Sequence, residues 1–179
     1  GKVITVKTEA YYQGKPTELK DILLNDDEVA DDFYIKDKPL KTVKTVVNKD
    51  GSLRTISTEK QMWEYLKGPK KEKRITKDGF EYNYAEGGMI YPDSPDNASR
   101  TIITGEGGKS PSRFKHVVET KKGLRRLTPI ELERLNMFPD DHTKLDGVTD
   151  AKRAFFMGNA LVVGVIEKLG KELYKQINE

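Results

Sequence analysis

Apolar side chains recur with a helical period near the carboxyl-terminal end of the chain. Val162, Ile166, Leu169, Leu173 and Ile177 follow one another in steps of four, three, four and four residues. This spacing places them along one face of an amphipathic helix. The pattern predicts a final helix with a single apolar stripe, and such a stripe needs a partner surface to cover it.

Another helix is predicted from the signals at its start. Thr128 is a typical N-cap residue, Pro129 suits the first helical position, and Glu131 can close a capping box with Thr128. The helix is expected to end near Asn136, because a proline follows three residues later. Shorter helices are predicted over residues 19–24, 59–66 and 149–156.

Short runs of β-branched residues between turn signals predict strands in the first two thirds of the chain. The turn sequence at residues 48–51 lies between two such runs, which indicates a hairpin. Asp78-Gly79 and Gly87-Gly88 separate later runs. The predicted strands are residues 3–8, 42–47, 53–57, 75–84, 88–91 and 100–104.

The composition narrows the class of protein. The chain has 179 residues, of which 35% are hydrophobic and 34% charged, so it can bury one core, or one core and a smaller appendage. It contains no apolar run long enough to cross a membrane, so no membrane role is expected. It also contains no cysteine, which excludes disulfides, thiolate metal sites and thiol nucleophiles within the chain. The absence of cysteine fits the reducing environment of the cytoplasm.

Charge is distributed unevenly along the chain. Residues 18–37 contain eight acidic side chains and two lysines, whereas residues 100–126 contain eight basic side chains and two glutamates. The basic segment includes a glycine-rich stretch and suits a polyanionic partner, although a solvated face is an equally good interpretation. Residues 67–74 are densely basic and are predicted to form a solvated loop, with phosphate contacts as the alternative.

Two further patterns are weak candidates for chemistry. Gly108-Lys109-Ser110 is reminiscent of a nucleotide-binding loop, but Ile103 stands where that motif needs glycine and Pro111 blocks the following helix. His116 and His142 have no other ligand at metal-binding spacing, so no metal site is expected. Trp63, the single tryptophan, is expected to anchor a core.

Three segments resemble conserved motifs of one enzyme family. The sequence RRLTPIE at residues 125–131, continued by NMFPD at 136–140, is similar to the ninth conserved motif of DNA (cytosine-5) methyltransferases. MGNALV at residues 157–162 is similar to the tenth motif. RTIITGEGG at residues 100–108 resembles the end of the target recognition domain. The resemblance covers residues 100–173 well and the preceding segment only by position.

The resemblance implies a reaction that this chain cannot complete alone. In the family, a cytosine is flipped out of duplex DNA, attacked at C6 by a cysteine and methylated at C5 by S-adenosylmethionine. The chain has no cysteine and lacks the family's methyl-donor loop, Pro-Cys motif, Glu-Asn-Val motif and Gln-Arg-Arg type segment. It is therefore expected to be inactive alone, with the cofactor bound mainly by a missing amino-terminal half. It resembles either one subunit of a split methyltransferase or a fragment of a longer polypeptide.

The resemblance also implies roles for individual residues. Leu161 and Val163 depart from the family, which often has Val or Pro there. Arg126 is expected to organise the recognition domain through hydrogen bonds. The residues expected to close the cofactor pocket are Asn159, Ala160 and Leu161. The residues expected to contact DNA are Arg100, Thr101, Thr104, Gly105, Glu106, Gly107, Gly108, Lys109, Ser110 and Arg113.

The sequence thus predicts an α/β (α+β) protein that completes an absent doubly wound methyltransferase domain. Residues 1–18 are expected to be a strand and linker from the catalytic domain, residues 19–122 the target recognition domain, and residues 123–179 a helical segment that docks on the catalytic domain. The expected partners are double-stranded DNA and that catalytic domain, and the resemblance implies an enzyme of a prokaryotic restriction-modification system. Two alternatives stay open: a stand-alone DNA-binding module, and a protein-interaction domain whose basic loop grips an acidic partner.

Overall fold

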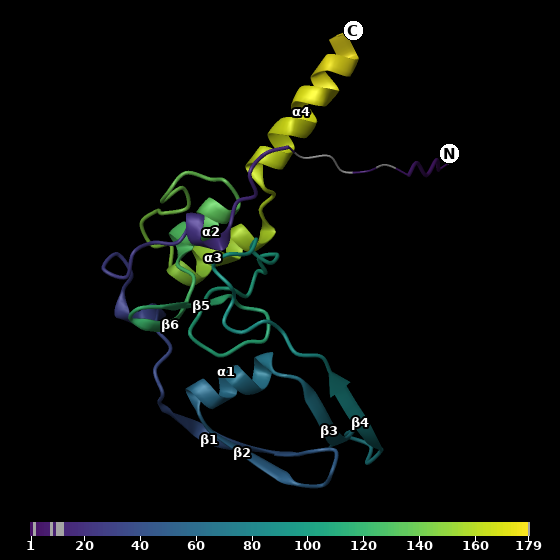
Figure 1. Ribbon diagram of the computed structural model, residues 1–179, viewed down its shortest axis with the longest axis vertical. Coiled ribbons are helices and arrows are strands. Elements are labelled where there is room, and N and C mark those ends of the chain that lie inside the picture. Colours follow the sequence, from purple (N-terminus) through teal and green to yellow (C-terminus); the bar gives the residue numbers. More distant parts are fainter. Residues whose placement is uncertain (2, 8, 10–12, 179) are drawn as a thin grey trace.

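The computed structural model describes residues 1, 3–7, 9 and 13–178 and shows a mixed α+β arrangement (Figure 1). The helices are α1 (Glu59–Lys67), α2 (Pro129–Leu135), α3 (Asp150–Asn159) and α4 (Val163–Asn178), with 3-10 turns at Leu19–Asp21 and Asp31–Phe33. The strands are β1 (Pro39–Val47), β2 (Leu53–Thr58), β3 (Lys70–Ile75), β4 (Glu81–Glu86), β5 (Val117–Thr120) and β6 (Gly123–Arg126). They form the antiparallel pairs β1–β2, β3–β4 and β5–β6.

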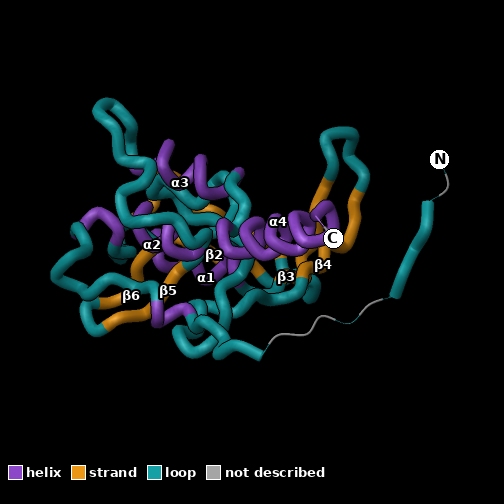
Figure 2. Tube along the Cα trace, turned by 90° about the horizontal axis from the view of Figure 1, so that it is seen from above, coloured by secondary structure: helices purple, strands orange, loops and turns teal. Residues whose placement is uncertain are grey.

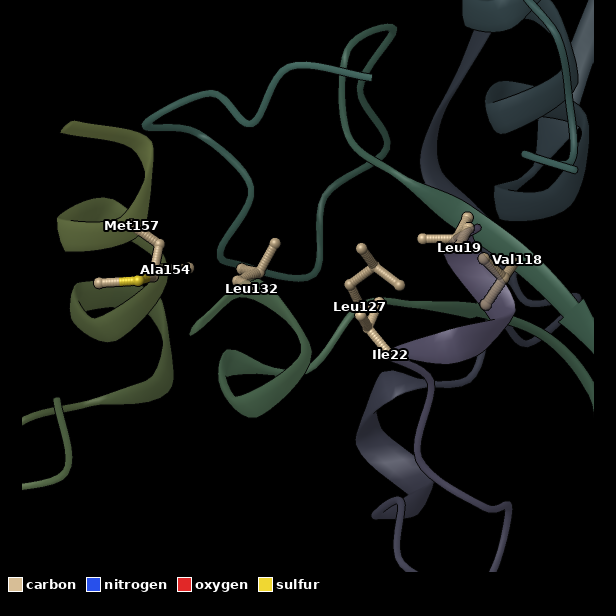
Figure 3. Packing of buried hydrophobic residues seen from close by; sticks show 7 residues of the cluster. All are labelled: Leu19, Ile22, Val118, Leu127, Leu132, Ala154 and Met157. Atoms are coloured by element: carbon tan, nitrogen blue, oxygen red, sulfur yellow. The ribbon is translucent and has the colours of Figure 1, made fainter. Parts of the chain in front are cut away.

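The main core joins parts of the chain that lie far apart in sequence (Figure 3). It combines the first 3-10 turn with β5, the residue before the N-cap of α2, and both α2 and α3. Its buried members are Leu19, Ile22, Val118, Leu127, Leu132, Ala154 and Met157. The core therefore draws on both sides of residue 122, so that the first 3-10 turn and the helices α2 and α3 depend on one another for burial.

The segment from β1 to β4 forms a separate hairpin module, residues 39–86, with a small core of its own built on Val46, Ile56 and Tyr65. An isolated bridge between Asn48 and Glu72 links its two hairpins. The module lies at the opposite end of the molecule from α4 in Figure 1, and Figure 2 shows β3 and β4 projecting from the body. The predicted hairpin and the helix that buries Trp63 are confirmed here.

The predicted start of α2 is confirmed. The Thr128 side chain accepts a hydrogen bond from Glu131 N, and the Glu131 carboxylate accepts one from Thr128 N at 2.7 Å, which closes the capping box. Helix α3 begins as predicted, after the N-cap Thr149, and continues three residues further than expected, to Asn159.

The final helix α4 is also confirmed, and it projects from the body of the molecule (Figure 1). It is attached through its first turn: Val163 N donates to Asn136 O at 2.9 Å, and Gly164 lies against the Met137 side chain. The predicted apolar stripe faces solvent, because no element within the described residues covers it.

Several predicted strands are wrong. Residues 3–7 form no regular secondary structure, and Thr8 lies outside the described residues. Residues 88–91 and 100–104 also form no strand, and the run at 75–84 contains the turn at Gly79 before β4 begins. A β-branched run fits any extended segment, but a strand requires a neighbour to pair with. Of the helix predicted at 19–24, the 3-10 turn Leu19–Asp21 forms.

The solvated loop predicted for residues 67–74 is wrong as well. The structure has β3 here, and Lys67 and Lys70 are buried. Lys70 forms an ion pair of 2.6 Å with Glu86, its register partner on β4. The two lysines are therefore committed to the interior, whereas Lys71 and Lys73 point to solvent. The sheets within the described residues are antiparallel, so the α+β part of the predicted fold class is the one observed.

Candidate functional site

Two of the candidate DNA-contacting residues and two of the candidate cofactor-facing residues line one open cleft. They are Arg100 and Thr101, and Ala160 and Leu161, which follow α3. The cleft has a volume of about 390 Å³. It is lined by Ser99, Arg100, Thr101, Ile102, Leu135, Asn136, Met157, Gly158, Ala160, Leu161 and Val162. Two segments that are about sixty residues apart in sequence thus line one cleft.

Arg100 is fixed by a buried carboxylate. Its guanidinium donates to Asp93 in bidentate fashion, at 2.7 and 3.1 Å, and to the carbonyl oxygens of Phe114 and Lys115. Burial by itself raises the pKa of Asp93, but hydrogen bonds from Arg100 and from Val117 N more than offset it, so the pKa lies below its usual value. This ion pair holds the extended segment at residue 100 against β5 without strand pairing.

Glu106 has a buried carboxylate that faces the protein. It accepts hydrogen bonds from His116 N at 2.9 Å and lies 2.8 Å from His116 Nδ1, while His116 Nε2 lies 3.1 Å from Ser99 Oγ. The sequence spacing indicated that His116 is isolated, but folding brings the Glu106 carboxylate next to it. The serine, histidine and glutamate follow the order of a nucleophilic triad. However, His116 is fully buried and the Ser99 hydroxyl also donates to Arg100 O, which indicates an anchor for the glycine-rich loop.

Three cations hold the backbone of the loop that follows. Lys115 Nζ donates to the carbonyl oxygens of Gly108 and Ser110, and Arg126 donates to Gly108 O at 2.9 Å and to Asp32 O at 2.7 Å. Arg113 pairs with Glu86 at 3.0 Å and donates to the carbonyls of residues 66 and 87, which ties the loop to the hairpin module. Protein atoms therefore bind most of the donors of Lys115, Arg126 and Arg113.

The acidic and basic segments of the sequence meet in space. Lys109 forms an exposed ion pair with Asp32 at 2.7 Å, and Lys122 forms one with Asp31 at 2.7 Å. Hydrogen bonds and Coulombic attraction from these lysines lower the pKa of both aspartates. Thr104, Lys109 and Ser110 still face solvent. The loop therefore offers a smaller positive surface than the sequence indicated.

The segment after α3 presents a mostly apolar wall to the cleft. The Asn159 side chain is exposed and donates to Phe155 O at 2.9 Å, and Leu161 is also exposed. Leu135, Met157 and Ala160 add apolar surface, and Asn136 adds a polar group whose Nδ2 donates to Met157 O at 2.8 Å. The wall thus combines apolar side chains with a polar group, as small-molecule sites commonly do.

Buried charges hold α2 and α3 in place beneath this wall. Arg125 and Glu131 form a fully buried bidentate pair, and Glu131 also accepts from Leu24 N. Burial raises the pKa of Glu133, but hydrogen bonds from Thr143 and Arg153 lower it below its usual value. No local sequence signal indicated this second network, because Thr143 and Arg153 lie ten and twenty residues from Glu133.

Other classes of site find no support in the described ranges. They contain no group of three or more His, Asp or Glu side chains placed to hold a metal ion. None of the helices there combines the length and apolar character that a membrane span requires.

Comparison with known proteins identifies the family. The sequence profile of C-5 cytosine-specific DNA methylases matches residues 3–175. The Type II methyltransferase M.Sau3AI of Staphylococcus aureus is 48% identical over 113 residues, which are 63% of this chain and 26% of that protein. The aligned part is thus about a quarter of the length of this relative. The chain belongs to the C-5 cytosine-specific DNA methylase family.

Proposed function

We propose that the chain is the DNA-recognition and cofactor-pocket-completing part of a DNA (cytosine-5) methyltransferase. The enzyme would methylate C5 of a flipped cytosine in a specific duplex site, within a restriction-modification system. Family membership supports the reaction class. The single observation that carries the assignment to this chain is the cleft that Arg100 and Thr101 line together with Ala160 and Leu161.

Recognition would be the task of residues 19–122. The loop at residues 104–110 and Thr101 contact DNA, while Arg113 fixes the loop on the hairpin module through Glu86. The exposed Thr104, Lys109 and Ser110 supply polar side chains, and the loop amides supply further donors. Three other residues support this surface from the interior, because protein atoms bind their charged groups: Arg100, Glu106 and Arg126.

The remainder of the chain would connect recognition to catalysis. Residues 123–179 dock on a catalytic domain through the exposed stripe of α4, and residues 1–18 belong to the strand and linker of that domain. An exposed regular apolar stripe supports this interface, because single scattered apolar residues are common on surfaces but an ordered row is not. Whether the catalytic domain precedes this chain or comes as a separate subunit does not alter the interface.

The cofactor would be S-adenosylmethionine, which supplies the methyl group. Asn159, Ala160 and Leu161 would close one side of its pocket, and the catalytic domain would supply most of the binding energy. The chain has no cysteine to serve as the nucleophile, so we expect no methyl transfer by this chain alone.

Reconstitution tests the proposal. The chain is combined with a catalytic domain of the family that carries the Pro-Cys motif, and transfer of labelled methyl groups from S-adenosylmethionine to duplex DNA is measured. We expect methylated cytosine in one defined site, none with either part alone, and weaker activity with Arg113→Ala. Methylation of adenine, or no methylation by a correctly assembled complex, would overturn the proposal.

The salt dependence of binding separates the alternatives. Binding of the chain to duplex DNA should weaken steeply as salt rises, because phosphate contacts release counterions. A chain that binds DNA but never supports methylation would be a stand-alone DNA-binding module. A chain that does not bind duplex DNA, but binds an acidic protein, would be an interaction domain.

A further inference from the structure

Helix α3 and the glycine-rich loop touch through their backbones. A Cβ atom added to Gly158 would lie 2.3 Å from Thr104 N and 2.4 Å from the carbonyl carbon of Ile103. Such distances are far inside van der Waals contact, and the atoms are main-chain atoms that cannot rotate away. Gly158 therefore allows the helix to approach the start of the loop more closely than any other residue would.

A second glycine makes the reciprocal contact. A Cβ atom added to Gly107 would lie 2.6 Å from Ala151 Cα and 2.9 Å from Ala151 O. Ala151 and Gly158 are seven residues apart, which is two helical turns, so both lie on the same face of α3. The loop from residue 103 to residue 107 thus lies along this face and is held at both ends.

The opposite side of the loop is held by charged groups. Glu106 is bound to His116, and the carbonyl oxygens of Gly108 and Ser110 are bound by Lys115 and Arg126. Within the described residues, the N–H groups of residues 107–110 donate to no protein acceptor. Two carbonyl oxygens of the loop are therefore held by the protein, whereas four of its amide donors have no protein acceptor and can bind a partner. The position of the backbone decides where those donors lie.

We propose that Gly107 and Gly158 are positioning residues that set the sequence selectivity of DNA binding by fixing this loop on α3. The inference rests on the proposed DNA-recognition function and adds to it that selectivity depends on two backbone contacts between the loop and α3. Reading a base edge requires donors placed to within a fraction of an ångström, whereas attraction to phosphates tolerates larger shifts. Displacing the loop should therefore reduce selectivity more than it reduces overall affinity.

The test uses two pairs of glycine substitutions in this chain, and each pair consists of a test variant and a control. Gly158→Ala is matched with Gly170→Ala, a helical glycine in α4 with no atom within 4 Å of an added Cβ. Gly107→Ala is matched with Gly87→Ala, a loop glycine outside residues 104–110 with no atom within 4 Å of an added Cβ. Selection from a pool of random duplexes measures selectivity, and titration of one fixed non-selected duplex at several salt concentrations measures general affinity. Amide hydrogen exchange of residues 103–110 reports the loop itself.

For Gly158→Ala and Gly107→Ala, we expect faster amide exchange in the loop. We also expect the ratio of the affinities for selected and non-selected duplexes to fall at least about tenfold, which corresponds to the loss of one good base contact. The salt slope on the non-selected duplex should persist, and amides in α1 and α2 should stay as protected as in the original chain, which unfolding would not allow. The two controls should match the original chain. Unchanged selectivity in the test variants, or equal loss of selectivity and general affinity, overturns the inference alone. If the original chain selects no sequence, the proposed function fails and the inference with it; the exchange data then still show whether the glycines hold the loop.

Discussion

Helices α2 and α4 relate to solvent in opposite ways. Helix α2 contains Glu131 and Glu133, and both are fully buried. Helix α4 carries a regular apolar stripe, yet Ile166, Leu169, Leu173 and Ile177 are 45%, 63%, 58% and 72% exposed. The short helix with charged residues is thus interior, and the longer helix with the clearer amphipathic pattern projects from the body (Figure 1).

The difference shows what an amphipathic pattern can and cannot say. The charges of α2 are tolerated inside because each one meets a fixed opposite charge and backbone donors. The stripe of α4 satisfies the pattern of a buried face, but burial requires a second surface, which we assign to a catalytic domain. Periodicity therefore identifies a helix face, while its partner is a property of the assembly.

The largest expected effect lies in the interior of α2. Glu131→Gln leaves Arg125 buried without a counter-charge, so we expect the free energy of unfolding to fall by about 3–5 kcal/mol in urea titrations. Glu167→Gln on α4, which breaks an exposed pair with Lys171, is the matched control and should leave stability unchanged. Similar losses for the two variants would contradict the contrast between the two helices.

Lys67 tests the same principle where the counter-charge is absent. It is fully buried, donates to Lys115 O and lies 5.9 Å from the ring centroids of Trp63 and Tyr91. Burial lowers the pKa of Lys67 from 10.5 to about 8. Between these two pH values the unfolded chain holds the proton more firmly than the folded one, so this group makes stability rise as pH rises.

We therefore expect the unfolding free energy of the original chain, relative to Lys67→Met, to increase between pH 8 and pH 10. The gain should be on the order of 2–3 kcal/mol, because each unit of pKa shift corresponds to about 1.4 kcal/mol. Denaturant titrations of both proteins at several pH values measure it. A constant difference across this range would show that Lys67 keeps an ordinary pKa in the fold.

The stripe of α4 should respond in association and not in stability. Introducing Leu169→Glu with Leu173→Glu should leave the melting temperature of the chain unchanged, because both side chains already face solvent. Its affinity for the catalytic domain should fall at least about tenfold, measured by calorimetry, since charges would enter an apolar interface. Lys171→Glu makes the same change in net charge on the opposite face of α4 and is the control. Equal binding by the two variants would remove the proposed docking face.

The smallest effect is expected at an exposed ion pair. Asp32→Asn releases Lys109, so affinity for duplex DNA at low salt should rise about two- to fivefold. The salt slope should steepen by about 0.9 if Lys109 then contacts one more phosphate. Asp37→Asn, an equally exposed change in the same acidic segment, should alter neither quantity. Filter binding over a salt series distinguishes the two.

Local signals predicted the helices and one hairpin well. Three signals were reliable: the capping box at Thr128, the turn at residues 48–51 and the helical period of α4. Each signal depends on residues that are close together in the sequence, so the local sequence is enough to specify it. The strands expected at residues 88–91 and 100–104 did not form, because strand pairing depends on a neighbour that the local sequence does not specify.

The candidate site was predicted in part. The motif segments indicated which residues to consider, and the structure brings Arg100 and Thr101 to the same cleft as Ala160 and Leu161. Sequence spacing could not indicate that three of these residues pair within the protein. Arg100 pairs with Asp93, Arg113 with Glu86 and Glu106 with His116. Charge counted along the sequence therefore overstated the positive surface that remains exposed.

The sequence by itself determined the positions of the helices and the motifs of the family, because capping, periodicity and motif order are local or linear properties. Tertiary structure alone decided which charges are interior and which are free, since an ion pair such as Lys109 with Asp32 joins residues far apart in the chain. It also decided the contact of Gly158 with the loop, because a glycine is required only where another backbone lies too close to leave room for a side chain.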